Sequence, residues 1–424
     1  MRVLILNQFF YPDYSATSQL MTDLAESLVE QGVEVTALSS RSRYQGGAPL
    51  PSREQYRGVR IERAWATSFG KGSIAGRLSD YLSFFIGATW RLARTSRPDI
   101  VLALTTPPLI GLVAIIVGRL RGTRTVALVQ DVYPDVAVAL GTLREGSPAT
   151  RLLDYLSRVI LRRADRIIVL GDCMRERIIK KIGESNSSRV DVIRNWADAS
   201  QFDYSGEDEE ENPFVAEHHL EDRFVVLFSG NLGRVNEFGT VLDAARILRE
   251  RREILFLFIG EGAQKSEIED FVARHGLGNV RLLPYQPRAQ LRYSLRAGHA
   301  LLVALRDGLA GLSVPSKAYT ILAAGRALLY VGDGGSDVAR MVLEHECGAV
   351  LAAGESERLA QVIIGWADDR EKLLEMNSAA RAAFEKSFER GQAVSAYLKT
   401  FERCLKSDSP DTLNEAARLE ENSP

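Results

Sequence analysis

The stretch FVVLFSGNLGRVNEFGTVLDAARILRER, residues 224–251, joins a strand, a glycine-containing turn and a helix. Its first five residues are apolar, a run typical of a buried strand. The turn SGNLGR follows, and from about Gly239 apolar residues recur at helical spacing. This order predicts a βα unit. Such units assemble into a parallel sheet with helices on both faces.

The same alternation extends in both directions along the chain. Strand-like runs downstream are ILFLFIG (254–260), VRLL (280–283), HALLVAL (299–305), ALLYVG (327–332) and CGAVL (347–351), and those upstream are RVLILN (2–7), VEVTALSS (33–40), DIVLAL (99–104), TVALVQD (125–131), RIIVLG (166–171) and VDVIRN (190–195). Helical stretches separate several of them. The sequence therefore predicts an α/β protein with two tandem Rossmann-like, doubly wound domains that face a cleft. Ligands of such sheets bind outside the carboxyl ends of the strands, so the cleft is the expected site.

A run of five acidic residues, 207–211, indicates where the first domain ends. Like charges at this density repel one another and favour solvent. We therefore place a linker-side loop at 201–222. The N-terminal domain then spans 1–200 and the C-terminal domain spans 223–385.

Two segments remain at the C-terminal end. Residues 386–405 carry Val394, Tyr397 and Phe401 at helical spacing, and we expect this helix to pack back on the N-terminal domain. Residues 406–424 are polar and acidic and are predicted to be disordered.

Composition limits the class of protein. The 424 residues are 46% hydrophobic, ample for two packed domains. Three widely separated cysteines argue against a disulfide framework and a zinc site and indicate a reducing, cytoplasmic compartment. The N-terminus lacks the pattern of a signal peptide, and no apolar stretch reaches the roughly 20 residues of a membrane-spanning helix.

Charge is distributed unevenly along the chain. Residues 1–195 contain 27 Lys and Arg against 18 Asp and Glu, whereas residues 196–424 contain 26 against 37. A basic half suggests an anionic surface or substrate for the first domain. Ordinary drift of surface charge is the alternative.

Two loops of the second domain carry candidate phosphate-binding residues. In GLSVPSKAYTILAAGRALLY (311–330), Ser316 and Lys317 stand at a helix start, where unpaired N–H groups and a positive dipole end favour an anion. Gly230 and Gly233 let the backbone approach a ligand closely, and Arg234 adds forked donors for phosphate oxygens. The alternatives are a plain helix cap with a solvated lysine and an ordinary glycine turn with a solvated arginine.

Further strand ends offer weaker candidates. Glu261 and Tyr285 could line a nucleobase or ribose pocket, or serve only their loops. In the first domain Tyr11, Ser15 and Thr17 precede a helix. The alternative is that Ser15 or Thr17 is only its N-cap.

Asp131 also follows a strand of the first domain, where a carboxylate could take a proton from a hydroxyl or stabilise cationic charge. A cap or turn role is the alternative. The sequence shows no HExxH, no DxD triplet and no Ser/His/Asp array, so we expect no metal.

These residues resemble a known family when taken together. ADRIIVLGDCMRERI, VDVIRNWADASQF, SGNLGR, GEGAQKSEIEDF, VPSKAYTILAAGRALL and GGSDVARMV are similar to glycosyltransferase family 4, the retaining transferases of GT-B fold. QDVYPDVAVALG and VPSK look most like the branch that builds bacterial exopolysaccharide, colanic-acid and O-antigen units. The resemblance implies transfer of a sugar from a nucleotide-sugar, UDP-linked rather than GDP-linked, with retention and without a metal.

The resemblance also implies roles for particular residues. In the family a basic pair neutralises the diphosphate leaving group, and Arg234 and Lys317 match it. From this match and from the strand-end positions described above, we expect donor binding at Gly230, Asn231, Gly233, Arg234, Glu261, Tyr285, Ser313, Val314, Ser316, Lys317 and Thr320. We expect catalytic roles for Asp131, Arg234 and Lys317, and acceptor binding by Tyr11, Ser15, Thr17 and Asp131.

The chain departs from the family pattern at three positions. Asn231 falls near a position where many relatives carry arginine. Thr320 occupies the place of the second of two glutamates that the family separates by seven residues, and Asp307 is the only acid nearby. Gln130 replaces a histidine that many relatives have before DVYPD.

The implied acceptor is a lipid-diphosphate-linked sugar, held by the N-terminal domain at the inner membrane. Residues 77–98 combine Tyr81, Phe84, Phe85 and Trp90 with arginines, a composition typical of an interfacial segment. A buried amphipathic helix with a solvated basic face is the alternative.

Two other functions remain open: a nucleotide-sugar epimerase of the same fold, and an inactive nucleotide-sugar-binding subunit. A dehydrogenase is disfavoured because no GxGxxG opens the first βα unit, and no P-loop is present.

Overall fold

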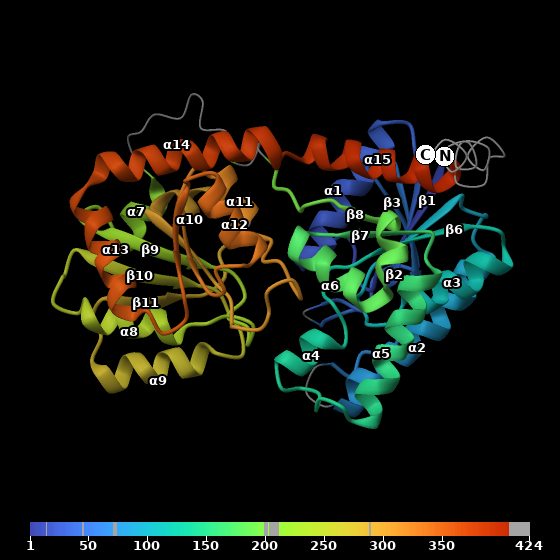
Figure 1. Cartoon of the computed structure of the whole chain (residues 1–424), viewed down its shortest axis with the longest axis horizontal. Coiled ribbons are helices and arrows are strands. Elements are labelled where there is room, and N and C mark those ends of the chain that lie inside the picture. Colours follow the sequence, from blue (N-terminus) through green and yellow to red (C-terminus); the bar gives the residue numbers. More distant parts are fainter. Residues whose placement is uncertain are drawn as a thin grey trace, which may run out of the picture. The chain divides into compact units, whose positions relative to one another are not determined.

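A computed structural model describes residues 1–13, 15–44, 46–70, 74–198, 202, 212–287 and 290–406. Two compact units divide the chain. Unit 1 comprises Met1–Val138, Leu143–Arg194 and the chain from Gly391 onward, and unit 2 comprises Ala139–Thr142 and Asn195–Arg390. Each contains a largely parallel sheet with helices packed on it, which confirms the predicted fold class (Figure 1).

The unit boundaries differ in detail from the predicted domains. Unit 1 gives way to unit 2 after Arg194 rather than at residue 200. Within the predicted loop 201–222, Pro213–His218 forms helix α7, which Asn212 caps and which packs on α10. The acidic run 207–211 and the predicted disordered segment from 407 to 424 lie outside the described residues.

The sheet of unit 1 has the order β3-β4-β2-β1-β5-β6-β7-β8. Its strands are β1 (Arg2–Leu6), β2 (Glu34–Ser40), β3 (Arg53–Tyr56), β4 (Val59–Ala64), β5 (Ile100–Ala103), β6 (Arg124–Leu128), β7 (Arg166–Val169) and β8 (Val190–Val192). All neighbours pair in parallel except β3 and β4, which pair antiparallel. The order reverses direction between β1 and β5, which makes this the switch point of the sheet.

Helices connect these strands, and the last helix of the chain joins them. They are α1 (Ala16–Glu30), α2 (Ile74–Arg94), α3 (Gly111–Leu120), α4 (Asp135–Ala139), α5 (Pro148–Arg163), α6 (Asp172–Ile182), the 3-10 turn η1 (Glu184–Arg189) and α15 (Arg390–Lys406). The crossovers through α2, α3, α5 and α6 all run in the same direction across the sheet, so right-handed connection places these helices on one face. The inward faces of α2 and α3 pack on β1 and β5 through Phe84, Ala88, Val113 and neighbouring side chains.

Helix α15 completes unit 1 from the far end of the sequence. Thr400 donates a hydrogen bond from Oγ1 to the Asp191 carboxylate on β8, at 3.3 Å, and Arg403 donates another at 2.9 Å. Tyr397 and Phe401 are fully buried. The helix starts at Arg390 rather than 386, because α14 (Arg370–Ser387) extends past the predicted domain end at 385.

Unit 2 has the strand order β11-β10-β9-β12-β13-β14, all parallel. Its strands are β9 (Phe224–Ser229), β10 (Ile254–Ile259), β11 (Val280–Leu283), β12 (Ala300–Ala304), β13 (Ala327–Val331) and β14 (Gly348–Leu351). Its helices, besides α7, are α8 (Gly239–Ile247), α9 (Lys265–His275), α10 (Leu291–Ala297), α11 (Lys317–Ala323), α12 (Asp337–Glu344), α13 (Ser356–Asp368) and α14. This is the dinucleotide-binding order 3-2-1-4-5-6, with the switch point between β9 and β12.

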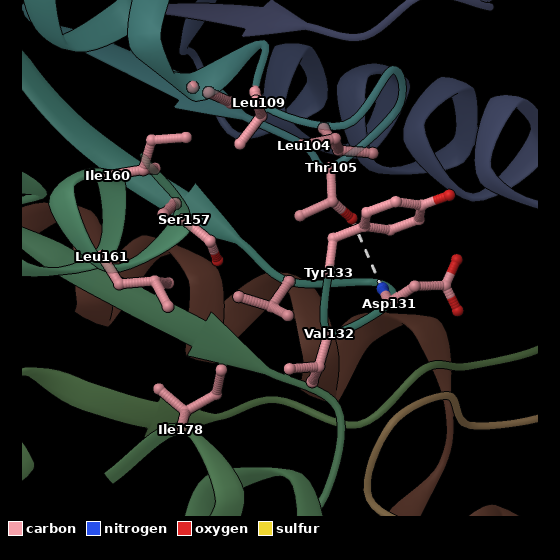
Figure 2. Close-up of a pocket in the computed structure, with 14 residues that line it drawn as sticks. Leu104, Thr105, Leu109, Asp131, Val132, Tyr133, Ser157, Ile160, Leu161 and Ile178 are labelled. Carbon is pink, nitrogen blue, oxygen red and sulfur yellow. Dashed lines mark hydrogen bonds between the residues drawn. The ribbon is translucent and has the colours of Figure 1, made fainter. Parts of the chain in front are cut away.

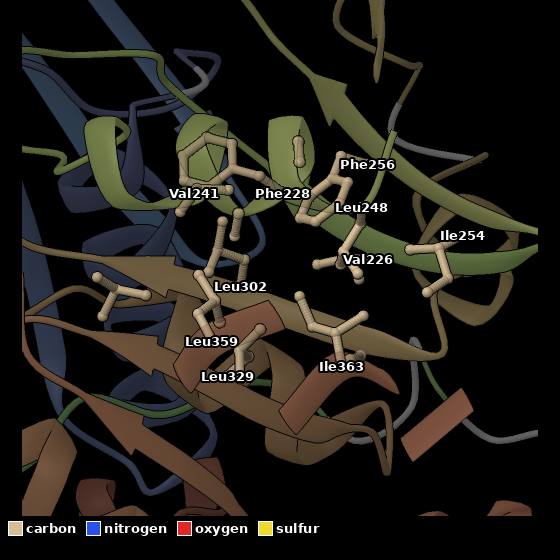
Figure 3. Close-up of a cluster of buried hydrophobic side chains, with 14 of the residues drawn as sticks. Val226, Phe228, Val241, Leu248, Ile254, Phe256, Leu302, Leu329, Leu359 and Ile363 are labelled. Carbon is tan, nitrogen blue, oxygen red and sulfur yellow. The ribbon is translucent and has the colours of Figure 1, made fainter. Parts of the chain in front are cut away.

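The core of unit 2 explains why the opening stretch of sequence folds as it does. Alternate residues of β9, Val226 and Phe228, point to the same side of the sheet, where Val241 and Leu248 of the helical run meet them (Figure 3). Ile363 from α13 closes the same cluster. The strand end that leads to Gly230 is therefore held rigidly by packing.

Candidate active site

The loops after β9, β10 and β12 converge at the switch point of unit 2. Leu232 donates its N–H to the Glu261 carbonyl, and Gln264 donates its N–H to the Leu232 carbonyl, both at 2.9 Å. On the other side, Arg306 donates its N–H to the Val235 carbonyl at 2.9 Å. The loop after β9 is thus tied to both of its neighbours.

Two glycines make this close approach possible. At Gly260, with φ of +149°, an added Cβ would stand 1.9 Å from the Gly230 carbonyl oxygen. At Gly262, with φ of +159°, it would stand 2.5 Å from the Leu232 carbonyl. Any larger residue would push the two loops apart. The buried Gln264 side chain completes the clamp by donating to the Gly233 carbonyl at 2.6 Å and the Asn236 carbonyl at 3.1 Å.

Lys317 reaches this junction from the first turn of α11. Its Nζ lies over the Phe228 ring, 3.5 Å from the centroid, and a Cβ at Gly230 would stand 3.4 Å from it. Within the described residues Nζ makes no hydrogen bond or ion pair. Burial lowers the pKa of Lys317 to about 7. The ammonium therefore faces the glycine backbone with a ring as its neighbour and no counterion.

The start of α11 offers fewer unpaired N–H groups for an anion than the sequence suggested. The helix spans only Lys317–Ala323, and Ser316 is its N-cap in helical conformation without a side-chain cap bond. Ala318 and Tyr319 already donate their N–H groups to the carbonyls of Pro315 and Ser316, at 3.2 Å each. The cation at this position comes from the Lys317 side chain rather than from an extended helix dipole.

The remaining residues before and on α11 lie beside Lys317. Val314 is buried and Ser313 is half-buried in the segment that leads from β12 to the helix. Thr320 is half-buried, three residues after Lys317 and so on the same face of the helix. Its hydroxyl thus lies on the side of α11 that carries Lys317.

The predicted residues of the neighbouring loops are exposed to differing degrees. Arg234 and Asn231 are exposed, and Arg234 makes no ion pair with the described part of the chain. The Glu261 carboxylate accepts from Lys265 Nζ at 2.8 Å. Tyr285 is 47% exposed, and its hydroxyl lies 3.4 Å from the Glu261 carbonyl. Aromatic rings at such a partly exposed position are suited to stacking on planar ligands.

In unit 1, Asp131 lies at the carboxyl end of β6. Thr105 fixes its backbone, because Thr105 Oγ1 accepts the N–H groups of Gln130 at 3.2 Å and Asp131 at 3.3 Å. The Asp131 carboxylate points away from Leu161 and Ile178, on the side toward which the Tyr133 ring extends (Figure 2). A cavity of ≈ 40 Å³, lined mainly by apolar side chains, adjoins this backbone.

Titratable groups gather around Tyr133. Burial raises its pKa, the neighbouring Tyr81 and Asp131 add to the rise, and Arg77 opposes it. Phenolic hydroxyls and a carboxylate that share one strand end can orient a polar, hydroxyl-bearing ligand.

The other predicted residues of unit 1 have structural partners. Ser15 is the N-cap of α1 and accepts the Ser18 N–H at 3.3 Å, which supports the capping alternative. Tyr11 stacks on Tyr56 with centroids 3.7 Å apart. Thr17 is half-buried in the first turn of α1.

Two family descriptions match the chain along most of its length. Residues 17–196 match the "Glycosyl transferase 4-like domain", and residues 209–383 match "Glycosyl transferases group 1". The chain is 30% identical over 287 residues to "Probable glycosyltransferase WbjE" of Pseudomonas aeruginosa, across 68% of this chain and 70% of the relative. The chain belongs to glycosyltransferase family 4.

Other comparisons agree with this assignment. "Putative colanic acid biosynthesis glycosyl transferase WcaI" of Escherichia coli is 25% identical over 337 residues, which cover 77% of this glycosyltransferase and 82% of WcaI. Sucrose-phosphate synthase from Thermosynechococcus elongatus superposes with a TM-score of 0.77 at 13% identity, over 96% of this chain and 100% of that one. Anabaena Alr3699/HepE, solved with UDP and glucose, superposes with a TM-score of 0.71 at 16% identity, over 95% of this chain and 99% of that one. These structures show that this family 4 glycosyltransferase has the GT-B fold.

Sequence reasoning missed three residues of the glycosyltransferase that position others. Phe228 was counted only as strand core, yet its ring lies under Lys317. Gln264 and Thr105 hold backbone carbonyls and amides at strand ends. A polar residue just after an apolar strand is a signal that could have found Thr105, and one just before a helix could have found Gln264.

Two searches of the described residues found nothing. No helix there is long and apolar enough to cross a bilayer. No group of three or more His, Cys, Asp or Glu side chains there could hold a metal ion.

Proposed function

We propose that this glycosyltransferase moves a sugar from a nucleotide-sugar, a UDP-sugar rather than a GDP-sugar, to a polysaccharide-precursor acceptor that is lipid-linked. The transfer would retain the anomeric configuration and need no metal. The donor diphosphate would bind in unit 2 at Gly230, Arg234 and Lys317. Asp131 in unit 1 would face the acceptor hydroxyl. The reaction would take place in the cytoplasm, at the inner membrane.

The observation that carries this proposal is the Lys317 ammonium. A cation that lacks a counterion and is partly desolvated gains more from an approaching anion than a solvated one does. Charge on the departing diphosphate grows as the sugar leaves, so the ammonium would stabilise the transition state more than the bound ground state. The exposed guanidinium of Arg234 would add two parallel donors to the same phosphates.

The relatives support the choice of donor and pathway. HepE was solved with UDP and glucose, and the name of WcaI states colanic acid biosynthesis. Thr320 in place of a glutamate predicts that ribose and sugar hydroxyls are held differently from those in most relatives. The exposed Tyr285 ring is our candidate for stacking on the base.

A thermal-shift screen of UDP, GDP, ADP and their sugars tests the donor assignment. A ligand that binds only the folded state raises the free energy of unfolding, by about 2.7 kcal/mol at a concentration one hundred times its Kd, and so raises the melting temperature. We expect UDP and UDP-sugars to raise it most. No shift with any of these nucleotides would contradict the proposed site.

Lys317→Met tests the role of the ammonium. We expect the variant to lose the UDP shift and about 100-fold or more in turnover. Its melting temperature at pH 6 should not fall, because methionine fills the same space over Phe228 without a buried charge. Lys265→Met, which removes a lysine already paired with Glu261, is the control and should keep most activity. A folded Lys317→Met protein with full turnover would sink the assignment.

Turnover and the UDP thermal shift, measured with and without acceptor, separate the two alternative functions, an epimerase and an inactive binding subunit. An epimerase would convert the donor sugar with no acceptor present. An inactive binding subunit would show the UDP shift yet neither hydrolyse the donor nor transfer the sugar to lipid-linked acceptors.

A further inference from the structure

One face of α2 presents an unpartnered apolar row to solvent. Leu78, Leu82, Ile86 and Trp90 recur every fourth residue, and each exposes more than half of its surface. Residues four apart lie on one face of a helix, and these four span roughly 18 Å along its axis. Exposed single residues are ordinary, but a continuous row of large ones is not.

The neighbouring helices also expose large apolar residues. α3 packs beside α2, and α5 packs beside α3 (Figure 1). Ile116 and Leu120 of α3 and Leu152 and Tyr155 of α5 are exposed. All three helices cover the same face of the sheet of unit 1, so their outward sides form one surface. We call these outward sides of α2, α3 and α5 the apolar surface.

This surface overlaps the segment 77–98 that the sequence indicated but uses largely different side chains. Of the aromatic residues expected at an interface, Phe84 is fully buried and Tyr81 and Phe85 are half-buried, whereas Trp90 is exposed. The buried-helix alternative is therefore right for the inner side of α2. The outer side is apolar as well, through leucine and isoleucine.

Arginines frame the apolar surface. The three helices contain eight arginines, two aspartates and no lysine. Asp80 accepts from the Thr67 hydroxyl and the Phe69 N–H, and Asp154 is held by Lys181 at 2.7 Å. The Arg94 guanidinium lies over the Trp90 ring, 4.4 Å from its centroid. Six of the eight arginines are exposed, whereas Arg91 and Arg158 are half-buried and pair with Glu62 and Asp154. The outward sides of the three helices therefore carry a net positive charge.

We propose that the apolar surface docks on an anionic lipid bilayer. Leucine, isoleucine and tryptophan side chains would enter the region between headgroups and acyl chains, and the arginines would contact lipid phosphates. The site is separate from the donor loops of unit 2, so the inference stands apart from the proposed donor chemistry.

A second copy of the chain fits this surface less well. A symmetric dimer sets the same patch of each copy against the other. Two patches of the same net positive charge would then meet, which disfavours the contact. A bilayer offers phosphate and hydrocarbon at one interface, which matches both parts of the surface.

Co-sedimentation of the full chain with vesicles tests the proposal. We expect binding to phosphatidylcholine vesicles that contain about one third phosphatidylglycerol, weak binding to pure phosphatidylcholine, and loss of binding near 0.5 M salt. Leu82→Ser combined with Ile86→Ser should weaken binding at least tenfold, as should Arg94→Glu combined with Arg151→Glu. Leu343→Ser in unit 2 is the matched control, because Leu343 is as exposed as Leu78, at 61%.

Tryptophan fluorescence locates the contact. Emission should shift to shorter wavelength on anionic vesicles, and Trp90→Phe should remove most of that shift. All variants should keep the melting temperature of the parent and its shift with UDP, because the replaced side chains are exposed and outside the donor loops. A vesicle defect with a normal UDP shift separates this inference from the proposed function.

Three results would overturn the proposal. One is equal binding to neutral and anionic vesicles, and another is no binding to either. The third is a dimer in lipid-free solution that Leu82→Ser with Ile86→Ser dissociates, which would assign the surface to a second copy.

Discussion

Lys317 ties the chemistry of the donor site to pH. Burial lowers the pKa of this lysine to about 7, so the free enzyme holds it protonated below pH 7 and largely neutral above. A bound diphosphate favours the ammonium and raises the pKa in the complex. Binding must therefore take up a proton above pH 7, and affinity should fall by up to about tenfold per pH unit there, while staying flat below.

Calorimetric titration with a UDP-sugar between pH 6 and 8, in two buffers of different ionisation enthalpy, measures this directly. The diphosphate of a nucleotide-sugar does not ionise in that range, so the proton is assigned to the protein. Lys317→Met should show weak binding without proton uptake. Affinity of the parent that does not change from pH 6 to 8 would refute a titrating Lys317.

Single residues are easiest to single out from sequence where their own chemistry is unusual. A proline, a hydroxyl and a cation before a run without carboxylates indicated Lys317, and the structure places its ammonium over the Phe228 ring. Its role in donor binding stays a prediction. Ser15 shows the opposite case, since a hydroxyl before a helix is most often a cap and is one here. Phe228 could not be predicted, because a ring in a buried strand gives no sign of the charge that approaches it from α11.

The donor loops depend on two glycines that bring them into contact. Gly260→Ala would place a methyl group against the Gly230 carbonyl and demand a φ of +149°, which side chains rarely adopt. We expect loss of about 2–4 kcal/mol of stability and a greatly weakened UDP shift. Chemical denaturation and the thermal-shift assay measure the two effects.

Gly334→Ala provides the comparison at the same edge of unit 2. No atom lies within 4 Å of the position its Cβ would take. The free energy of unfolding of Gly334→Ala should lie within about 0.5 kcal/mol of that of the parent, and the variant should keep UDP binding. Equal behaviour of the two variants would show that the contact between the loops does not matter.

The positions of the strands followed from the pattern of apolar residues, but which side chains of a helix face solvent did not. The strands of both units appear in the sequence as short apolar runs because both faces of a parallel sheet are buried. Residues 77–98, which include most of helix α2, stood out by composition, and composition does not separate the inward Phe84 from the outward Leu82. α7 was missed because it is short and adjoins an acidic run that favours solvent.

At the scale of the whole molecule, sequence predicted the kind of units but not their strand order. The βα rhythm requires parallel sheets, whereas the order 3-2-1-4-5-6 of unit 2 depends on which edges the helices leave free. That order decides where function lies, since it sets the switch point between β9 and β12 and brings Gly230 to Lys317. Residues more than 80 positions apart in sequence cannot be paired by local pattern.

The chain returns to unit 1 at its end, so α15 should contribute to the stability of a unit built mainly from residues before 195. Phe401 is fully buried there, and Phe401→Ala should lower the free energy of unfolding by about 3–5 kcal/mol through lost burial and a cavity. Leu405→Ala, on the same helix at a side chain 39% exposed, should change it by less than about 1 kcal/mol. Urea titration followed by tryptophan fluorescence compares them. If Phe401→Ala is as stable as Leu405→Ala, the docking of α15 contributes little to unit 1.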